Sequence, residues 1–263
     1  MINVLQSLSL PGALRNEDRI WYNERCLVLL DGSTGLVRTE LDAVWFVDGF
    51  LALFQEELAR TNGLPAAINT ALSRLQERFE ALSGNGTYEY LPSASALFFL
   101  QQGDCLQVVN VGDCSALLIG ETVQKLYLDE VERFDSQVIR RMLALRAENG
   151  QDLAQLVQTP EIRQMLIANR KMMNRPEGYR ILAFNMAPVT DADVMRFPLA
   201  GMHRIVALSD GFELLEEELA REDAELPALY ERLRDMEEKD SSLNRFPRLK
   251  KRDDASAVIF TVS

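Results

Sequence analysis

Four strongly apolar runs in this chain begin or end at an aspartate, and this pattern constrains the fold more than any other feature. The positions are Asp31 after LVLL, Asp113 after VVNVG, Asp210 after IVALS, and Asp253 with its neighbour before ASAVIF. A carboxylate at the tip of a buried strand is costly to desolvate unless positive charge meets it. Four such tips drawn together would suit hard divalent cations, which bind oxygen ligands. The pattern therefore suggests a hydrolase that uses two metal ions.

Composition limits the classes of protein that the chain can belong to. It has 263 residues, with 28 Lys and Arg against 40 Asp and Glu and a net charge of -12, which argues against nucleic acid or an anionic membrane as its partner. The sequence is 47% hydrophobic and contains no linker-like stretch, so we expect a single domain over 1–263. There is no signal-peptide pattern, and no run approaches the roughly 18 apolar residues of a membrane span. The three cysteines show no CxxC spacing, which favours a reduced, cytoplasmic protein.

Hydrophobic spacing predicts an order of strands and helices along the chain. Strands are expected over 2–10, 25–30, 179–184, 194–199, 204–208 and 255–262, with four more between 93 and 128. Glycine-containing turns separate these four, so we expect an antiparallel meander there. Helices are expected over 41–58 and 64–82, within 129–174, and over 213–238 with a break near Pro227. The mixture indicates an α/β protein.

Five short motifs occur in a recognisable order. They are NED at 16–18, DGSTG at 31–35, VGDCSALL at 111–118, ALSDG at 207–211 and RDDASAVIF at 252–260. Together they resemble the motif set of the metal-dependent serine/threonine protein phosphatases of type 2C, in compact bacterial form, across nearly the whole chain. The resemblance implies two mainly antiparallel β-sheets packed as a sandwich, with helices on both outer sides. It also implies that the segment at about 129–179 is the family's variable flap with adjoining helices, which would set substrate choice.

The resemblance further implies a metal centre of two Mg²⁺ or Mn²⁺ ions at one end of the sandwich. Asp31 would bridge both ions, and the backbone carbonyl of Gly32 would join the second. The other expected ligands are carboxylates: Asp210 and Asp253 on the first ion, Glu17 on the second, and Asp113 on a weaker third. Asp18 and Asp254 would support these ligands or hold water.

The chemistry suits these residue types independently of the family. Hydrolysis of a phosphate ester needs a nucleophile at neutral pH and positive charge for the phosphate oxygens, and two ions about 3.5–4 Å apart supply both by acidifying a water. Asp31, Asp210 and Asp253 would then be catalytic through metal-bound water. Oxygen-only ligation favours Mg²⁺ or Mn²⁺, whereas zinc normally draws on His or Cys. The chain has one histidine, His203, and no nucleophile-elbow motif for it to serve.

Two departures from the family pattern leave alternatives open. Ser33 stands where many members have a histidine that could protonate the leaving group, and Ala13 stands where an arginine often holds the phosphate. Arg15 is the nearest substitute for that arginine. The sequence favours a monomeric phosphatase for phosphoserine or phosphothreonine in a protein partner. A catalytically idle module that binds a partner protein, and a phosphatase for a small metabolite, remain the alternatives.

Overall fold

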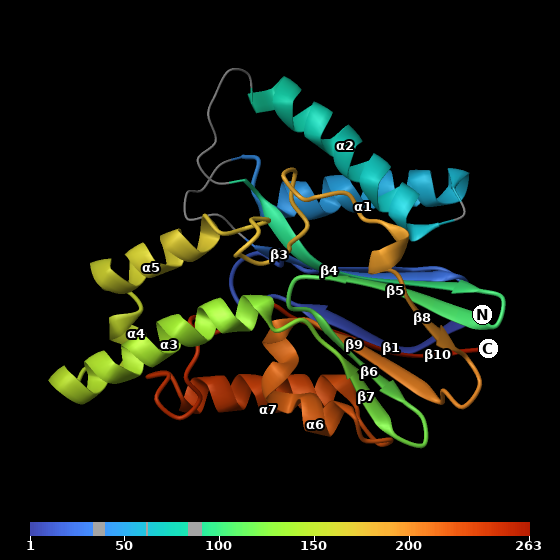
Figure 1. Cartoon of the computed structure of the whole chain (residues 1–263). Coiled ribbons are helices and arrows are strands. Elements are labelled where there is room, and N and C mark those ends of the chain that lie inside the picture. Colours follow the sequence, from blue (N-terminus) through green and yellow to red (C-terminus); the bar gives the residue numbers. More distant parts are fainter. Residues whose placement is uncertain (34–39, 62, 84–90) are drawn as a thin grey trace.

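The computed structural model describes residues 1–33, 40–61, 63–83 and 91–263, and its centre is a pair of stacked sheets (Figure 1). One sheet has the strand order β1-β10-β9-β6-β7 and the other β2-β3-β4-β5-β8. All pairings between these strands are antiparallel. The first sheet comprises β1 (Ile2–Leu10), β10 (Ala255–Val262), β9 (Arg204–Leu208), β6 (Ser115–Ile119) and β7 (Val123–Leu126). The second comprises β2 (Arg19–Tyr22), β3 (Cys26–Ser33), β4 (Ser93–Gln102), β5 (Cys105–Val111) and β8 (Met195–Pro198).

Helices cover both outer faces, which confirms the expected layered sandwich. The pair α1 (Ala43–Arg60) and α2 (Leu64–Ser83) packs on the second sheet. The other face is covered by η2 (Asp210–Leu215), α6 (Glu216–Leu219) and α7 (Leu226–Lys239). At one end of the sandwich, away from the chain termini, lie α3 (Glu130–Asn149), α4 (Leu153–Leu156) and α5 (Pro160–Arg170) (Figure 1). A short 3-10 turn, η1 (Asp191–Asp193), precedes β8.

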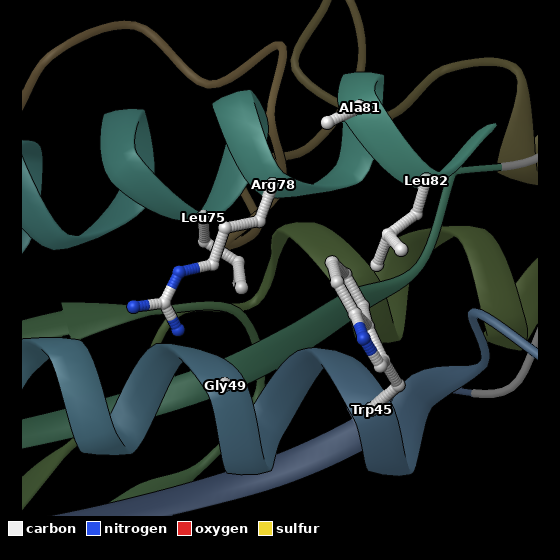
Figure 2. A pocket seen from close by; sticks show the side chains of 6 residues that line it. All are labelled: Trp45, Gly49, Leu75, Arg78, Ala81 and Leu82. Carbon is white, nitrogen blue, oxygen red and sulfur yellow. The ribbon is translucent and has the colours of Figure 1, made fainter. Parts of the chain in front are cut away.

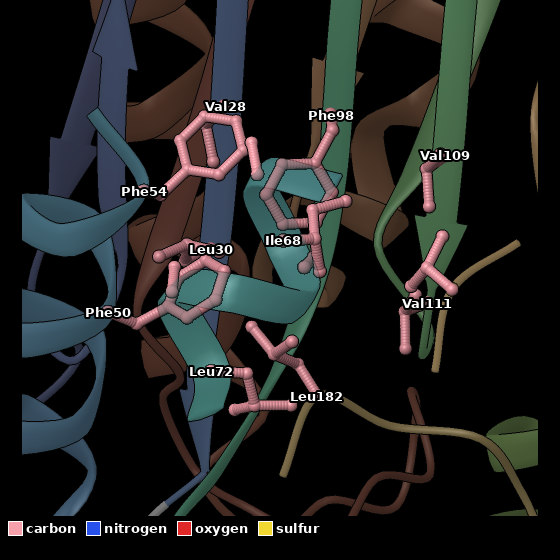
Figure 3. Close-up of a cluster of buried hydrophobic side chains, with 14 of the residues drawn as sticks. Val28, Leu30, Phe50, Phe54, Ile68, Leu72, Phe98, Val109, Val111 and Leu182 are labelled. Atoms are coloured by element: carbon pink, nitrogen blue, oxygen red, sulfur yellow. The ribbon is translucent and has the colours of Figure 1, made fainter. Parts of the chain in front are cut away.

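Strand β3 shows how the sequence builds the two neighbouring cores. Leu27 and Leu29 belong to the cluster between the sheets. Val28 and Leu30 face the other way and pack with side chains of α1 and α2 (Figure 3). All four are completely buried, so the run is apolar throughout instead of alternating with polar residues. Each buried side chain contributes about 1.5–3 kcal/mol, and this anchors the strand that carries Asp31.

The two helices predicted near the N-terminus are confirmed as α1 and α2. Asp42 caps α1 by accepting a hydrogen bond from the amide of Trp45 at 3.0 Å. The break near Pro227 is also confirmed, because this proline lies in the first turn of α7. The DGSTG motif includes residues 34 and 35, which lie outside the described residues. Among the helices of the described chain, none is both long and apolar enough to cross a bilayer.

The region from 93 to 128 is not a single meander, contrary to the prediction. β4 pairs with β5 and β6 with β7, but β5 and β6 belong to different sheets. The turn at Gly112 and Asp113 therefore carries the chain from one sheet to the other at the end of the sandwich. Gly112 has a φ of 90°, and a Cβ there would lie 2.3 Å from the hydroxyl oxygen of Ser95. A turn dipeptide looks the same in sequence whether it closes a hairpin or joins two sheets.

The predicted strand over 179–184 is also wrong. The segment forms only isolated bridges, Ala94 to Leu182 and Met173 to Tyr179. Its apolar side chains instead fill a small cluster that includes Tyr179, Ile181 and Ala183. A short apolar run gives the same pattern whether it pairs in a sheet or packs as an irregular segment. Strand β2, which pairs with β3, was not predicted.

Candidate active site

A cavity of about 720 Å³ opens at one end of the sandwich, beside α3 and α5. It collects five residues that the sequence nominated from separate motifs: Asp31, Gly32, Asp113, Asp210 and Asp253. They come from β3, the connection between the sheets, the start of η2 and the loop before β10. The predicted convergence of acidic strand ends is therefore found in the structure.

Two glycines allow the loops around this cavity to approach closely. A Cβ at Gly211 would lie 1.9 Å from the carbonyl oxygen of Asp254, so the turn after β9 touches the loop before β10. A Cβ at Gly32 would lie 2.7 Å from the carbonyl oxygen of Glu17, which accepts the Gly32 amide at 3.3 Å. The carboxylate of Asp254 accepts the amides of Gly12 at 2.7 Å and Glu17 at 2.6 Å. Asp254 therefore fixes the backbone of Glu17 beside Gly32.

Burial, followed by repulsion between neighbouring carboxylates, disfavours ionisation of the aspartates in the cavity. Burial raises the pKa of Asp31 well above its ordinary value, and Asp18, Asp210, Asp113 and Asp253 raise it further. Desolvation at the cavity raises the pKa of Asp210 well above its ordinary value, and Asp253 and Asp113 raise it further. Asp210 itself remains exposed. Burial likewise raises the pKa of Asp113. The aspartates of the cavity are therefore only partly matched by positive charge.

Asp18 is the most enclosed member of this group, with 1% exposure. One of its oxygens, Oδ2, accepts the hydroxyl of Ser209 at 2.9 Å. The other, Oδ1, is buried and has no hydrogen-bond partner in the described chain. Burial raises the pKa of Asp18 to about 7. A buried carboxylate oxygen without a donor is rare in proteins and is consistent with a water or cation supplied from outside.

The donor set fits Mg²⁺ or Mn²⁺ in chemistry and charge. It consists of oxygens, its carboxylates oppose one another's ionisation, and Asp18 has an unsatisfied oxygen. Within residues 1–33, 40–61, 63–83 and 91–263, however, no three acidic, His or Cys side chains stand close enough to hold one ion. Magnesium keeps several waters and often takes only one or two carboxylates directly. The arrangement therefore suits ions held in large part through water.

Lys250 also lines the cavity, and the sequence analysis passed over it. Its ammonium lies 2.7 Å from Oδ2 of Asp253. Burial acts to lower the pKa of Lys250, but Asp253, Asp210 and Asp31 outweigh this and raise it well above its ordinary value. The side chain nevertheless remains 60% accessible to solvent. In the sequence, a lysine within LKKRDD has the pattern of a solvated charge.

The helical segment expected at about 129–179 forms one wall of the cavity. Val131, Asp135 and Ile139 of α3 line it at four-residue spacing, and Arg170 lines it from α5. Burial raises the pKa of Asp135 to about 7, and Asp113 adds to the effect. A carboxylate interrupting an apolar stripe of helical spacing is the sequence signal that could have identified Asp135.

Arg170 ties this wall to the end of β3. Its guanidinium donates to the hydroxyl of Ser33 at 2.8 Å, to the Ser33 carbonyl at 2.9 Å and to the hydroxyl of Ser93 at 3.3 Å. Burial lowers the pKa of Arg170, and Glu17 is among the groups that counteract it. Ser33, which follows the Asp31-Gly32 pair, is thereby held in place by the flap segment.

Two predicted residues lie outside the described cavity lining. Arg15 is 62% exposed and pairs with Asp42 at 2.7 Å, at the start of α1. Glu17 contributes its backbone contacts with Gly32 and Asp254, as described above. The roles predicted for Arg15 in substrate binding and for the Glu17 carboxylate in metal binding stay predictions.

A second hollow of about 310 Å³ lies between α1 and α2 (Figure 2). Its walls come from Trp45, Gly49, Leu75, Arg78, Ala81 and Leu82. None of these lining residues is acidic, so this hollow does not provide the donors for divalent metal chemistry. The cavity at the end of the sandwich is the better candidate.

Comparison with known proteins places this site in a wider context. Neither a family model nor a curated protein matches the sequence. Solved structures do match along the full length. The serine/threonine phosphatase PstP/Ppp of Mycobacterium tuberculosis is 19% identical, with a TM-score of 0.54 and coverage of 100% of this chain and 99% of that one. Stp1 of Staphylococcus aureus is 12% identical, with a TM-score of 0.57 and coverage of 99% and 96%.

Two further structures extend the likeness. PppA, a regulatory component of the type VI secretion system of Pseudomonas aeruginosa, is 15% identical over 99% of this chain and 97% of its own, with a TM-score of 0.53. A PstP catalytic domain solved with two manganese ions is 19% identical over 99% and 97%, also with a TM-score of 0.53. The chain therefore has the fold of the bacterial PPM serine/threonine phosphatases. The resemblance seen in the motifs is confirmed for the fold.

Proposed function

We propose that this protein is a metal-dependent phosphomonoester hydrolase that dephosphorylates phosphoserine or phosphothreonine in a protein substrate. The observation that carries the proposal is the meeting of Asp31, Asp210 and Asp253 in one cavity, although they lie far apart in the chain. Asp210 and Asp253 oppose the ionisation of Asp31, and Asp253 opposes that of Asp210, which supports a cation-binding role. The likeness to PstP and Stp1 supports the type of reaction.

Under this proposal two Mg²⁺ or Mn²⁺ ions, with a weaker third, occupy the cavity. The residues that would hold them are Asp31, Gly32 through its carbonyl, Asp210, Asp253, Glu17 and, for the third, Asp113. When bound, the cations supply positive charge for the phosphate and lower the pKa of water. Asp254 holds the Glu17 backbone in place, and Ser209 orients Asp18 by its hydrogen bond. Ser33 cannot act as the missing histidine would, so water in the cavity protonates the leaving group.

The surface around the site suggests how a protein substrate would be bound. The flap segment forms a wall of the cavity, so its α3 and α5 side chains would meet the residues that flank the phosphoamino acid. Arg15 is proposed to meet the substrate phosphate, which requires it to leave Asp42. We further propose a cytoplasmic, monomeric enzyme whose partner is a phosphorylated protein. A net charge of -12 disfavours nucleic acid as a partner.

Asparagine substitutions test the function directly. Asp31→Asn and Asp210→Asn should each reduce Mn²⁺-dependent hydrolysis of an aryl phosphate by more than about a hundredfold, since loss of even an outer-shell partner of a metal costs 10- to 100-fold. The matched control is Asp191→Asn, which makes the same change at a side chain with 89% exposure. Circular dichroism would verify the fold of each variant. Unchanged turnover in both cavity variants would refute the assignment.

An idle module that binds a partner protein is the second candidate, and two observations favour it. Lys250 already pairs with Asp253, and no three potential ligands in the described chain are close enough to share an ion. Calorimetric titration distinguishes the two, because an idle module would bind neither Mg²⁺ nor Mn²⁺ up to millimolar concentration. If metal binds, turnover on phosphopeptides against sugar and nucleotide phosphates would separate a protein phosphatase from one that acts on a small metabolite.

A further inference from the structure

We propose that Lys250 is a built-in counter-cation whose ammonium competes with the divalent ions for the carboxylates of the cavity. This inference rests on the proposed metal-dependent function and concerns the regulation of the same site. The ammonium lies 2.8 Å from Oδ1 and 2.7 Å from Oδ2 of Asp253, so it meets both oxygens of one proposed ligand. Lys250 lines the same cavity as Asp31 and Asp210.

The loop that carries Lys250 is fixed on both sides of the lysine. Before it, Arg248 donates to the Asp240 carboxylate at 2.8 Å and to the Phe246 carbonyl at 2.9 Å. After it, Arg234 of α7 donates to the carbonyl of Asp253 at 2.8 Å. These contacts hold the backbone in place, so the position of Lys250 at the cavity follows from the fold of the loop.

The lysine side chain is suited to leave the site again. Its backbone is fixed but its four-carbon stem is flexible, and 60% of the side chain is accessible in the cavity. The ammonium can therefore withdraw into water without disturbing the core. A divalent ion brings twice the charge to the same carboxylates and would replace it. Lys250 would thus compensate charge in the metal-free protein and raise the metal concentration needed to fill the site.

The size of the effect follows from the charges involved. A single exposed ion pair shifts an equilibrium by at most about fivefold. Several carboxylates and a divalent ion share this cavity, and their interactions with the ammonium are less screened than at an open surface. We therefore expect removal of the Lys250 charge to tighten Mn²⁺ binding by roughly five- to tenfold.

The test compares two neighbouring lysines in the full chain. Lys250→Met keeps an unbranched stem and removes the charge. Lys251→Met makes the same change at an exposed residue that is not among the described lining residues of the cavity. Isothermal titration with Mn²⁺ should give tighter binding for Lys250→Met, and equal binding within about twofold for wild type and Lys251→Met, because that charge is screened by water and salt. Without metal, Lys250→Met should melt at a lower temperature than Lys251→Met, because the carboxylates lose their counter-charge.

The outcomes separate this inference from the proposed function. Equal Mn²⁺ affinity in all three proteins would overturn the role of Lys250 and leave the metal-dependent function standing. Weaker binding by Lys250→Met would also overturn it, since the lysine would then assist the ions. Binding by none of the three up to millimolar Mn²⁺ would remove the proposed function itself. Binding by Lys250→Met alone would support the inference in its strongest form, and Lys250→Gln provides an independent variant if the methionine impairs folding.

Discussion

Two aspartates of the molecule have almost no solvent exposure but differ in the hydrogen-bond donors that surround them. Asp240, at the end of α7, is 3% exposed, and Asp18, beside the candidate site, is 1% exposed. Asp240 accepts two backbone amides at 3.0 Å each and the guanidinium of Arg248 at 2.8 Å. Asp18 accepts the Ser209 hydroxyl through one oxygen, and its other oxygen has no hydrogen-bond partner in the described chain.

Their pKa values move in opposite directions for this reason. Burial acts to raise the pKa of Asp240, but its two amide donors and Arg248 outweigh burial and hold the pKa below its ordinary value. Burial raises the pKa of Asp18 to about 7, the hydroxyls of Ser256 and Ser209 offset this only in part, and Asp254 and Asp253 oppose ionisation further. Burial alone therefore does not distinguish a structural carboxylate from a functional one. The distinction lies in whether the protein itself supplies the compensating donors.

The largest expected effect concerns Asp240. Asp240→Asn removes the charge that Arg248 and two amides are arranged to meet, and it leaves a guanidinium without its counter-charge. We expect a loss of about 3 kcal/mol in the free energy of unfolding, the size typical of a broken buried pair. Urea denaturation at pH 7 measures it, with Asp191→Asn as the exposed control. A loss no greater than the control's would show that the Asp240 network is not stabilising, and the comparison would fail.

A smaller effect of opposite sign is expected at the candidate site. Asp31→Asn removes one negative charge from a group of mutually repelling carboxylates. In the metal-free protein, in the presence of a chelator, we expect the free energy of unfolding to rise by about 1 kcal/mol, whereas most single substitutions lower it by a similar amount. The measurement is the same urea titration at pH 8. A decrease would mean that Asp31 is compensated within the fold, as Asp240 is.

Added metal should reverse the relative stabilities of wild type and Asp31→Asn. Wild-type protein at a Mn²⁺ concentration of about 100 times its Kd would gain about 2.7 kcal/mol through linkage. Asp31→Asn should gain much less because it lacks a carboxylate that is proposed to bind the ions. The variant would thus be the more stable protein without metal and the less stable one with it. If Mn²⁺ stabilised both proteins equally, Asp31 would have no part in metal binding.

The sequence predicted the individual apolar strands better than it predicted which strands pair with each other. The LVLL run identified β3 because a strand buried on both faces is apolar at every position. The pairing of β5 with β8, and of β6 with β9, could not be read from local patterns. Alternation of side chains shows which face of a strand is buried, but it carries no information on which strand lies beside it. The Gly112 turn was misassigned for this reason.

Some residues of the candidate site could be predicted from the sequence and others could not. Asp31, Asp210 and Asp253 were found because each follows or precedes a long apolar run in a known motif order. Lys250 was missed because a charge on a loop has the same local pattern whether it faces solvent or a cavity. Asp135 was missed although it interrupts an apolar stripe of helical spacing. Only the packing of α3 and the loop before β10 against the end of the sandwich places them there.

The pH dependence of stability tests whether α3 shares the electrostatics of the site. Burial and then Asp113 raise the pKa of Asp135 from 3.8 to about 7, although Lys250 acts in the opposite direction. Between about pH 4 and pH 7 the folded protein would hold a proton here that the unfolded chain releases, so this contribution to stability is present in acid and is lost as the pH rises through 7. Without metal, Asp135→Asn should therefore show a flatter decline of unfolding free energy across this range than wild type, by urea titration at several pH values. Parallel curves would mean that Asp135 ionises as it does in water, and that α3 lies outside the field of the carboxylates that set this site apart from Asp240.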